Sequence, residues 1–343
     1  MPLPLTSNSW SDDETKAAIE VIRSKNTTMG NHVVSFEREF ADFFKAKYAI
    51  MSNSGSSANL LAAAAITFSK FEGKPKGREV IVPAVSWATT FYPIVQLGYK
   101  LRFVDIDLES LNIDLDCVNN SINENTAGIF AVNLLGQPAA LNELQELCKK
   151  RHLFLLEDNC ESMGAKINER YCGTFGEIGT FSFFYSHHIN TMEGGMCLTD
   201  DEKLAQYLHS LRAHGWTRGL PDKNLVFDKL GDSWEDQFRF VLPGYNLRPL
   251  EVSAAIGRIQ LGKFESMLKT RKSNAAFFNN RFRGIPNILI QSGVGESSSF
   301  AFSIILKHSL KGKRSAILNL LEMNGIETRP IVTGNFIRQP VFK

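Results

Sequence analysis

Short apolar runs separated by amphipathic stretches dominate the first half of the chain. Strands are predicted where β-branched and aromatic residues cluster over about five positions. These runs are Glu79-Val-Ile-Val-Pro83, Leu101-Arg-Phe-Val-Asp105, Ala127-Gly-Ile-Phe-Ala-Val132, Leu153-Phe-Leu-Leu-Glu157 and Gly179-Thr-Phe-Ser-Phe-Phe184. Helices are predicted at residues 87–97, 114–122 and 139–150, where apolar residues recur three or four positions apart. Repeated strand–helix units of this kind predict an α/β fold with a mostly parallel central sheet.

The pattern changes after the turn at residues 242–249. Two helices are predicted, over residues 250–261 and 265–282, followed by a strand at 300–306 and a helix at 314–323. This organisation predicts a large domain over residues 1–248 and a smaller C-terminal α/β domain over residues 249–343. We expect the small domain to lack a closing helix, as it would if the chain were truncated at its C-terminus.

Composition excludes several classes of protein. The 343 residues, 43% of them hydrophobic, can bury a large core, and a formal net charge of +2 gives no basic surface for nucleic acid. No window approaches the roughly 20 apolar residues that span a bilayer, and the N-terminus has no signal-peptide pattern. The five cysteines form no C-x-x-C pair, so no metal site is predicted. A cytoplasmic protein without nucleic-acid or membrane partners is expected.

A turn of small residues, Ser52-Asn-Ser-Gly-Ser-Ser-Ala-Asn59, opens an alanine-rich helical stretch. The free amides and the positive dipole end of such a helix can bind a phosphate. Ser56 or Ser57 can equally be an ordinary N-cap residue, so the turn by itself leaves both interpretations open.

Two carboxylates, Asp158 and Glu161, come directly after a predicted buried strand. A buried acid needs a cation, and a protonated pyridine nitrogen would be one that the carboxylate keeps able to accept electrons. A helix N-terminus or a lysine would serve equally well. Trp87, which follows the strand ending at Pro83, can stack on such a ring or pack in the core.

Adjacent histidines, His187 and His188, follow the strand that ends near residue 184. In an extended segment they point in opposite directions, so only one can face a ligand. An imidazole exchanges protons near neutral pH, which suits acid–base catalysis, but a histidine is also a common structural residue.

Four separated segments combine these features in a specific order. They are the turn Ser54-Gly-Ser-Ser57, Val82-Pro-Ala-Val-Ser-Trp87, Glu157-Asp-Asn-Cys-Glu-Ser162, and the stretch from Thr180-Phe-Ser-Phe183 to Glu193-Gly-Gly195. The set resembles the sugar aminotransferase/dehydratase group of fold-type-I pyridoxal-phosphate enzymes, and the resemblance runs from about Asn8 to the last residue. It implies the aspartate-aminotransferase-like fold, with the large domain binding the cofactor.

One position separates this chain from the aminotransferases of that group. They have a lysine where this chain has His187, and an imidazole cannot form a Schiff base with the cofactor. The resemblance therefore implies 3-dehydration of a nucleotide-linked 4-keto-6-deoxyhexose, with GDP-4-keto-6-deoxy-D-mannose as the expected substrate, on a route to colitose or a related lipopolysaccharide sugar. Dehydratases of this group that use an iron–sulfur cluster fit less well, because no cysteine follows Arg212.

The resemblance also implies a role for each matching residue. His187 would be the catalytic acid and base, and L-glutamate would regenerate pyridoxamine phosphate from pyridoxal phosphate, both bound non-covalently. The expected cofactor-binding residues are Gly55, Ser56, Trp87, Asp158, Glu161, Ser182 and, from the neighbouring subunit of a homodimer, Asn246. Expected contacts are His214 and Arg248 for glutamate, and Arg218, Glu327, Lys25, Asn26, Thr27 and Thr28 for the sugar nucleotide.

Two alternatives stay open on the sequence. The first is an ordinary nucleotide-sugar aminotransferase, against which the histidine at the lysine position speaks. The second is a non-catalytic family member that binds a sugar nucleotide, which the joint presence of His187, Asp158 and Trp87 disfavours.

Overall fold

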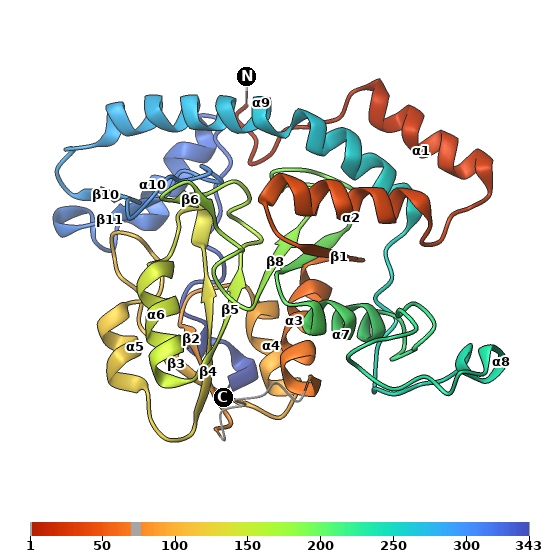
Figure 1. Cartoon of the computed structure of the whole chain (residues 1–343). Coiled ribbons are helices and arrows are strands. Elements are labelled where there is room, and N and C mark those ends of the chain that lie inside the picture. Colours follow the sequence, from red (N-terminus) through yellow and green to blue (C-terminus); the bar gives the residue numbers. More distant parts are fainter. Residues whose placement is uncertain (1, 70–76, 343) are drawn as a thin grey trace.

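The computed structural model describes residues 2–69 and 77–342. A seven-stranded sheet in the order β1-β9-β8-β5-β4-β2-β3 forms its centre (Figure 1). Its strands are β1 Tyr48–Ser52, β2 Glu79–Pro83, β3 Lys100–Val104, β4 Thr126–Val132, β5 Phe154–Asp158, β8 Ile178–Ser182 and β9 Gly195–Thr199. The strands from β3 to β8 pair in parallel, whereas β9 is antiparallel to both of its neighbours. The predicted α/β fold with a mostly parallel sheet is confirmed.

Helices cover both faces of this sheet (Figure 1). α3 is rich in alanine, and Ala62 to Ala65 are buried, so its backbone packs closely against β8 and β9. α4 and α7 pack beside α3, while α2 and α9 cover β1 and the other face. The helices of the sheet region are α2 Asn31–Phe44, α3 Gly55–Phe68, α4 Ala88–Gln96, α5 Leu115–Ser121, α6 Leu141–Arg151 and α7 Glu202–Arg212.

The remaining elements lie around this core. They are α1 Asp12–Ser24, α8 Ser233–Asp236, α9 Glu251–Phe282, α10 Arg314–Met323, the hairpin β6 Lys166–Ile167 with β7 Arg170–Tyr171, the pair β10 Ile288–Ile290 with β11 Ile304–Leu306, and 3-10 turns at Leu134–Gly136, His308–Leu310, Phe336–Arg338 and Pro340–Phe342. None of the helices within residues 2–69 and 77–342 combines the length and apolar character needed to cross a bilayer.

The prediction of two helices over residues 250–282 is wrong, because α9 is continuous from Glu251 to Phe282. Gly262 interrupts the apolar pattern, but a single glycine weakens a helix by only about 1 kcal/mol. The fully buried Phe264 holds the next turn against α2 and the sheet. The strand predicted at residues 300–306 is shorter, since only Ile304–Leu306 pairs with β10. The division into domains at residue 248 stays a prediction.

Candidate functional site

The site lies at the carboxyl edge of the sheet, where β5 ends at Asp158 and β8 ends at Ser182. α3 begins at Gly55 and α4 begins just after Trp87. In parallel α/β sheets this edge is where helix N-termini converge and ligands bind. The fold therefore brings together four segments that are far apart in the sequence.

The start of α3 lies directly against the end of β8, and we call Gly55, Ser56 and Ser182 the cradle. A Cβ placed on Gly55 would lie 2.4 Å from the Ser182 Cβ, so only glycine lets the two segments approach this closely. Ser54 is the N-cap, and its Oγ accepts from the Ser57 amide at 3.1 Å. The alternative that Ser56 or Ser57 is the N-cap, which the sequence left open, is therefore wrong. The Ser56 hydroxyl instead contacts Thr89 at 3.0 Å. The first amides of the helix remain available for an anion.

Asp158 is buried and held by neutral donors. Its Oδ2 accepts from Asn59 Nδ2 at 2.9 Å and from Thr90 Oγ1 at 2.7 Å. Thr180 Oγ1 in turn donates to Asn59 Oδ1 at 2.6 Å. The sequence left open an ion pair between Asp158 and a lysine, but the side chains that donate to Asp158 are those of Asn59 and Thr90. Asn59, Thr90 and Thr180 orient the carboxylate without neutralising it.

Trp87 stands at the N-cap of α4 with 57% of its surface exposed. This exposure excludes the core-packing interpretation. A large exposed aromatic ring is suited to stacking on a planar ligand.

Glu161 lies a short turn beyond Asp158. Burial raises the pKa of its carboxyl to about 7, although a hydrogen bond from the Leu135 amide at 3.1 Å and the positive charge of Arg329 both act to lower it. The negative charge of Asp158 acts in the same direction as burial. Glu161 is therefore close to half-protonated at neutral pH.

His187 lies in the loop after β8, and burial is the main reason that its pKa falls to about 4. The positive charges of Arg329 and Arg271 add to this effect. The ring packs against Phe300 with centroids 5.3 Å apart, and Nδ1 has no hydrogen-bond partner within the described part of the chain. At neutral pH His187 is thus an uncharged imidazole able to accept a proton.

His188 has a different environment from His187, although the two histidines lie in a turn and not in the extended segment on which the predicted alternation depended. It is 2% exposed, and a ring nitrogen lies 3.3 Å from the Ser298 carbonyl oxygen. Phe300 contacts both imidazoles, and its ring centroid is 5.4 Å from that of His188. His188 is a packed structural residue in this arrangement.

Four predicted residues, His214, Arg218, Asn246 and Arg248, belong to the segment between α7 and α9, an arm that carries α8 (Figure 1). The His214 amide donates to the Tyr245 carbonyl at 2.7 Å, and Arg248 Nε donates to Asn246 Oδ1 at 3.1 Å. The Asn53 amide donates to the Leu247 carbonyl at 3.1 Å, which places Asn246 and Arg248 beside the turn that leads into α3. Arg218 is exposed on the same arm.

The residues expected to meet the sugar nucleotide lie in two exposed segments. Lys25 to Thr28 form the turn between α1 and α2, where the Thr27 carbonyl accepts from the Glu251 amide at 3.2 Å. Glu327 accepts from the Leu5 amide at 3.0 Å. Within the described residues, no hydrogen bond joins either segment to His187, Asp158 or Ser182. Their roles stay predictions.

Arg329 and Phe300 belong to the site although the sequence did not single them out. The Arg329 guanidinium lies 5.7 Å from the Phe300 ring centre, and its charge acts on both His187 and Glu161. Arg329 sits in the motif Gly325-Ile-Glu-Thr-Arg-Pro330, in which Glu327 alone was predicted to function. The signal available in the sequence was that Arg329 lies two positions after Glu327 in the same motif.

Comparison with known proteins gives one family. The DegT/DnrJ/EryC1/StrS aminotransferase family matches residues 8–343. The chain is 50% identical over 336 residues to the GDP-4-keto-6-deoxy-D-mannose 3-dehydratase of Escherichia coli O55:H7, covering 98% of this chain and 87% of that protein. The enzyme of the same name from Yersinia pseudotuberculosis is also 50% identical, with 98% and 86% covered.

Solved structures of such dehydratases have the same fold. The E. coli enzyme with bound hydrated PLP has a TM-score of 0.95 at 50% identity, covering 98% of this chain and 87% of that one. A structure with a trapped PLP-glutamate geminal diamine has a TM-score of 0.94 at 50% identity, with the same coverage. A variant in which adjacent serine and histidine are replaced by asparagine and lysine has a TM-score of 0.94 at 49% identity, covering 98% and 88%.

Proposed function

Because the chain belongs to the DegT/DnrJ/EryC1/StrS aminotransferase family, we propose that it is a pyridoxal-phosphate-dependent lyase that removes the 3-hydroxyl of GDP-4-keto-6-deoxy-D-mannose. L-Glutamate supplies the amino group that regenerates pyridoxamine phosphate, in keeping with the PLP-glutamate adduct of a similar enzyme. The product is a 3-deoxy-4-keto sugar nucleotide, a precursor for a lipopolysaccharide deoxysugar.

One observation carries this proposal: a neutral, half-buried imidazole occupies the position where aminotransferases of the family need a lysine. Ser186-His187 is the only serine–histidine dipeptide in the sequence. A similar dehydratase has been solved with an adjacent serine and histidine replaced by asparagine and lysine, which supports His187 as the matching histidine. Lys166, a lysine near the motif in sequence, lies in β6, where its Nζ contacts Glu169 at 3.4 Å and the Tyr171 ring at 4.6 Å. These contacts support a dehydratase over an aminotransferase.

The residues at the sheet edge fit pyridoxal phosphate. The cradle of Gly55, Ser56 and Ser182 would hold the phosphate, Trp87 would lie on the ring, and Asp158 would meet the ring nitrogen. When bound, the cofactor supplies a cationic ring that accepts the electrons released on proton removal. Glu161, whose pKa is raised to about 7, would carry less negative charge near that cation than an ordinary glutamate does.

His187 performs the proton transfers. Because its pKa is about 4, the imidazole is uncharged at neutral pH and would accept a proton at its ring nitrogen when cofactor and sugar are bound. The same nitrogen would then donate that proton to the 3-hydroxyl oxygen, which would leave as water. Arg329 favours the return to the neutral imidazole, since a cation nearby disfavours the imidazolium.

We further propose a homodimer with shared active sites, Asn246 of one subunit completing the phosphate site of the other. Large exposed apolar side chains on the arm support an interface there, with Trp234 at 79%, Phe238 at 64% and Phe240 at 54% exposure. His214 and Arg248 would bind the glutamate carboxylates, and Arg218, Glu327 and Lys25 to Thr28 the sugar nucleotide.

Mass spectrometry of the sugar nucleotide tests the function. The protein is incubated with pyridoxal phosphate, L-glutamate and GDP-4-keto-6-deoxy-D-mannose, and loss of one oxygen atom from the sugar is expected. A new amine in place of the ketone would identify an aminotransferase instead. Unchanged substrate, with the CDP- and dTDP-linked sugars also unchanged, would reject the catalytic proposal.

A further inference from the structure

No side chain orients His187 through a hydrogen bond within the described part of the chain. The imidazole packs against the rings of Phe300, with centroids 5.3 Å apart, and Phe184, with centroids 6.0 Å apart. Its polar contacts are with the loop backbone, since the Phe184 backbone interacts with the ring and the Phe184 carbonyl accepts from the His187 amide at 2.8 Å. Catalytic histidines are usually held by a carboxylate or carbonyl on the second ring nitrogen. The direction of this imidazole must therefore be set by the backbone of the loop 183–193 that carries it.

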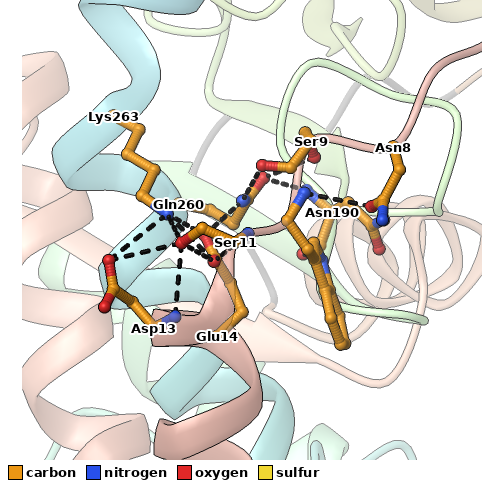
Figure 2. Close-up of polar contacts among 9 residues, drawn as sticks. Asn8, Ser9, Ser11, Asp13, Glu14, Asn190, Gln260 and Lys263 are labelled. Atoms are coloured by element: carbon orange, nitrogen blue, oxygen red, sulfur yellow. Dashed lines mark hydrogen bonds and ion pairs between the residues drawn. The ribbon is translucent and has the colours of Figure 1, made fainter.

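Two distant side chains hold that loop at Asn190 (Figure 2). The Asn190 amide donates to Gln260 Oε1 of α9 at 3.2 Å, and the Asn190 carbonyl accepts from Trp10 Nε1 at 3.1 Å. The Asn190 side chain accepts from the Met192 amide at 2.8 Å. The two peptide groups that flank Asn190 are therefore both held by hydrogen bonds. Asn190 lies three residues beyond His187, so these bonds fix the loop close to His187.

Gln260 is fully buried, and both ends of its amide are used. Its Oε1 also accepts from Ser9 Oγ at 3.0 Å, while its Nε2 donates to Glu14 Oε1 at 2.6 Å and to the Ser9 carbonyl at 3.2 Å. Because the carboxylate of Glu14 can only accept and the amide of Asn190 can only donate, the orientation of the Gln260 side chain is unambiguous.

Glu14 anchors this group of residues. Its side chain is completely buried and receives Lys263 Nζ at 2.8 and 2.9 Å and the Ser11 amide at 2.8 Å. Burial alone would raise the pKa of Glu14, but the hydrogen bonds from Lys263, Ser11 and Gln260 together lower it to about 2. The carboxylate therefore stays ionised across the range in which the enzyme would work, and the anchor does not change with pH.

We propose that Gln260 and Trp10 are positioning residues for His187, which hold Asn190 and thereby fix the loop that aims the imidazole. The catalytic part of this inference rests on the proposed function. The structural part, that the loop is held at Asn190, rests on the hydrogen bonds among residues 9–14, α9 and Asn190. A misdirected base costs turnover while leaving substrate contacts in place, since proton transfer depends on geometry of a few tenths of an ångström.

The test compares Gln260→Leu and Trp10→Phe with the wild type, and with Asn274→Leu as a matched amide replacement on the exposed face of α9. Trp10→Phe keeps the ring and removes only the donor to Asn190. We expect hydrogen–deuterium exchange in the peptide 183–193 of the cofactor-free protein to speed up several-fold in both variants. We expect kcat to fall about ten-fold in Gln260→Leu and a few-fold in Trp10→Phe, with KM for the sugar nucleotide little changed.

Exchange and turnover separate the possible outcomes. Wild-type exchange in both variants would overturn the proposal, because the loop would not depend on these bonds. Faster exchange in the variants with a wild-type kcat would also overturn the proposal. The bonds would then hold the loop, but holding the loop would not be needed to direct His187. An inactive wild-type protein would refute the proposed function, while the exchange result would still decide whether Gln260 and Trp10 hold the loop.

Discussion

Burial shifts the pKa values of two titratable side chains of the site, His187 and Glu161, in opposite directions. The pKa of His187 falls to about 4 and that of Glu161 rises to about 7, because a low-dielectric surrounding disfavours the charged form of each. At neutral pH the site therefore contains an uncharged base and a partly protonated acid. Asp158, held by the donors Asn59 and Thr90, remains to meet a cationic ring.

Replacing His187 by asparagine tests its catalytic role. We expect kcat to fall by at least about 100-fold, because the amide cannot exchange protons at neutral pH. Binding of pyridoxal phosphate, followed by absorbance, should be retained, since the cradle and Asp158 are untouched. His152→Asn is the control, because His152 is exposed at the end of α6 in a left-handed conformation that asparagine accepts. Turnover of His187→Asn near the control would exclude this residue as the base.

Glu161→Gln should change how stability depends on pH. A carboxyl with a raised pKa binds more protons folded than unfolded between about pH 4.5 and 7, so its contribution to stability is lost as pH rises through that window. Glutamine mimics the protonated acid and keeps an acceptor for the Leu135 amide. Relative to wild type, the cofactor-free variant should gain roughly 1–3 kcal/mol in free energy of unfolding from pH 5 to pH 8, measured by urea denaturation. A pH-independent difference would contradict the shift.

At this scale the sequence predicts residues whose role follows from a local motif. Asp158, Trp87 and Gly55 each stand at the end of a strand or the start of a helix, and His187 follows β8. Their local patterns left other interpretations open, and the order of the four motifs made the family resemblance that implies their roles. Asn59, Thr90 and Thr180 could not be found in this way, because a polar residue on a helix or strand acquires its role only from what tertiary packing places opposite it.

Among the secondary-structure elements, the start of α3 and the length of α9 matter most. α3 can meet β8 only because Gly55 has no side chain, and α9 contributes Gln260 and Lys263 from the middle of a 32-residue helix. Apolar periodicity predicted five strands of the sheet and α10 well. It missed β1 and β9, whose short sequences are paired by contacts far along the chain, and it divided α9 because the pattern shifts near Gly262.

A pair of glycine substitutions separates these effects. Gly55→Ala places a methyl group 2.4 Å from the Ser182 Cβ, so α3 or β8 must move and affinity for pyridoxal phosphate should fall at least about ten-fold. Gly262→Ala meets no atom within 4 Å on an exposed turn of α9 and should raise the free energy of unfolding by about 0.5–1 kcal/mol with cofactor affinity unchanged. Titration with cofactor and chemical denaturation measure the two effects. Equal cofactor affinities would argue against the cradle.

For the whole molecule, the central question is whether two chains build one site. The sequence predicted the fold and the family, and both are confirmed. It predicted a dimer through resemblance alone, because an interface depends on which apolar side chains the folded surface exposes. The arm bearing Trp234 and Phe238 supplies such a surface.

Mixing two inactive variants tests a shared site. If Asn246 completes the site of the neighbouring subunit, a hybrid of His187→Asn and Asn246→Ala chains has one site with both native residues and one with neither. Unfolding and refolding the two variants together should then restore about a quarter of wild-type activity, from the half of dimers that are hybrids. Each variant refolded alone is the control. No recovery, with dimers confirmed by light scattering at twice 38.4 kDa, would place Asn246 in its own subunit's site.

The contacts of residues 3–14 with residues far along the chain have a consequence for the order in which the protein matures. Leu3 forms a bridge with Ile326, and Ser9 donates to Gln260. During synthesis these early residues are made first, yet they must wait until Gln260 and then Ile326 have been made before these partners exist. The sheet can assemble earlier, so a nascent chain would pass through a stage with a formed sheet and an unsecured catalytic loop. Activity should therefore appear after compaction, as the last event of folding.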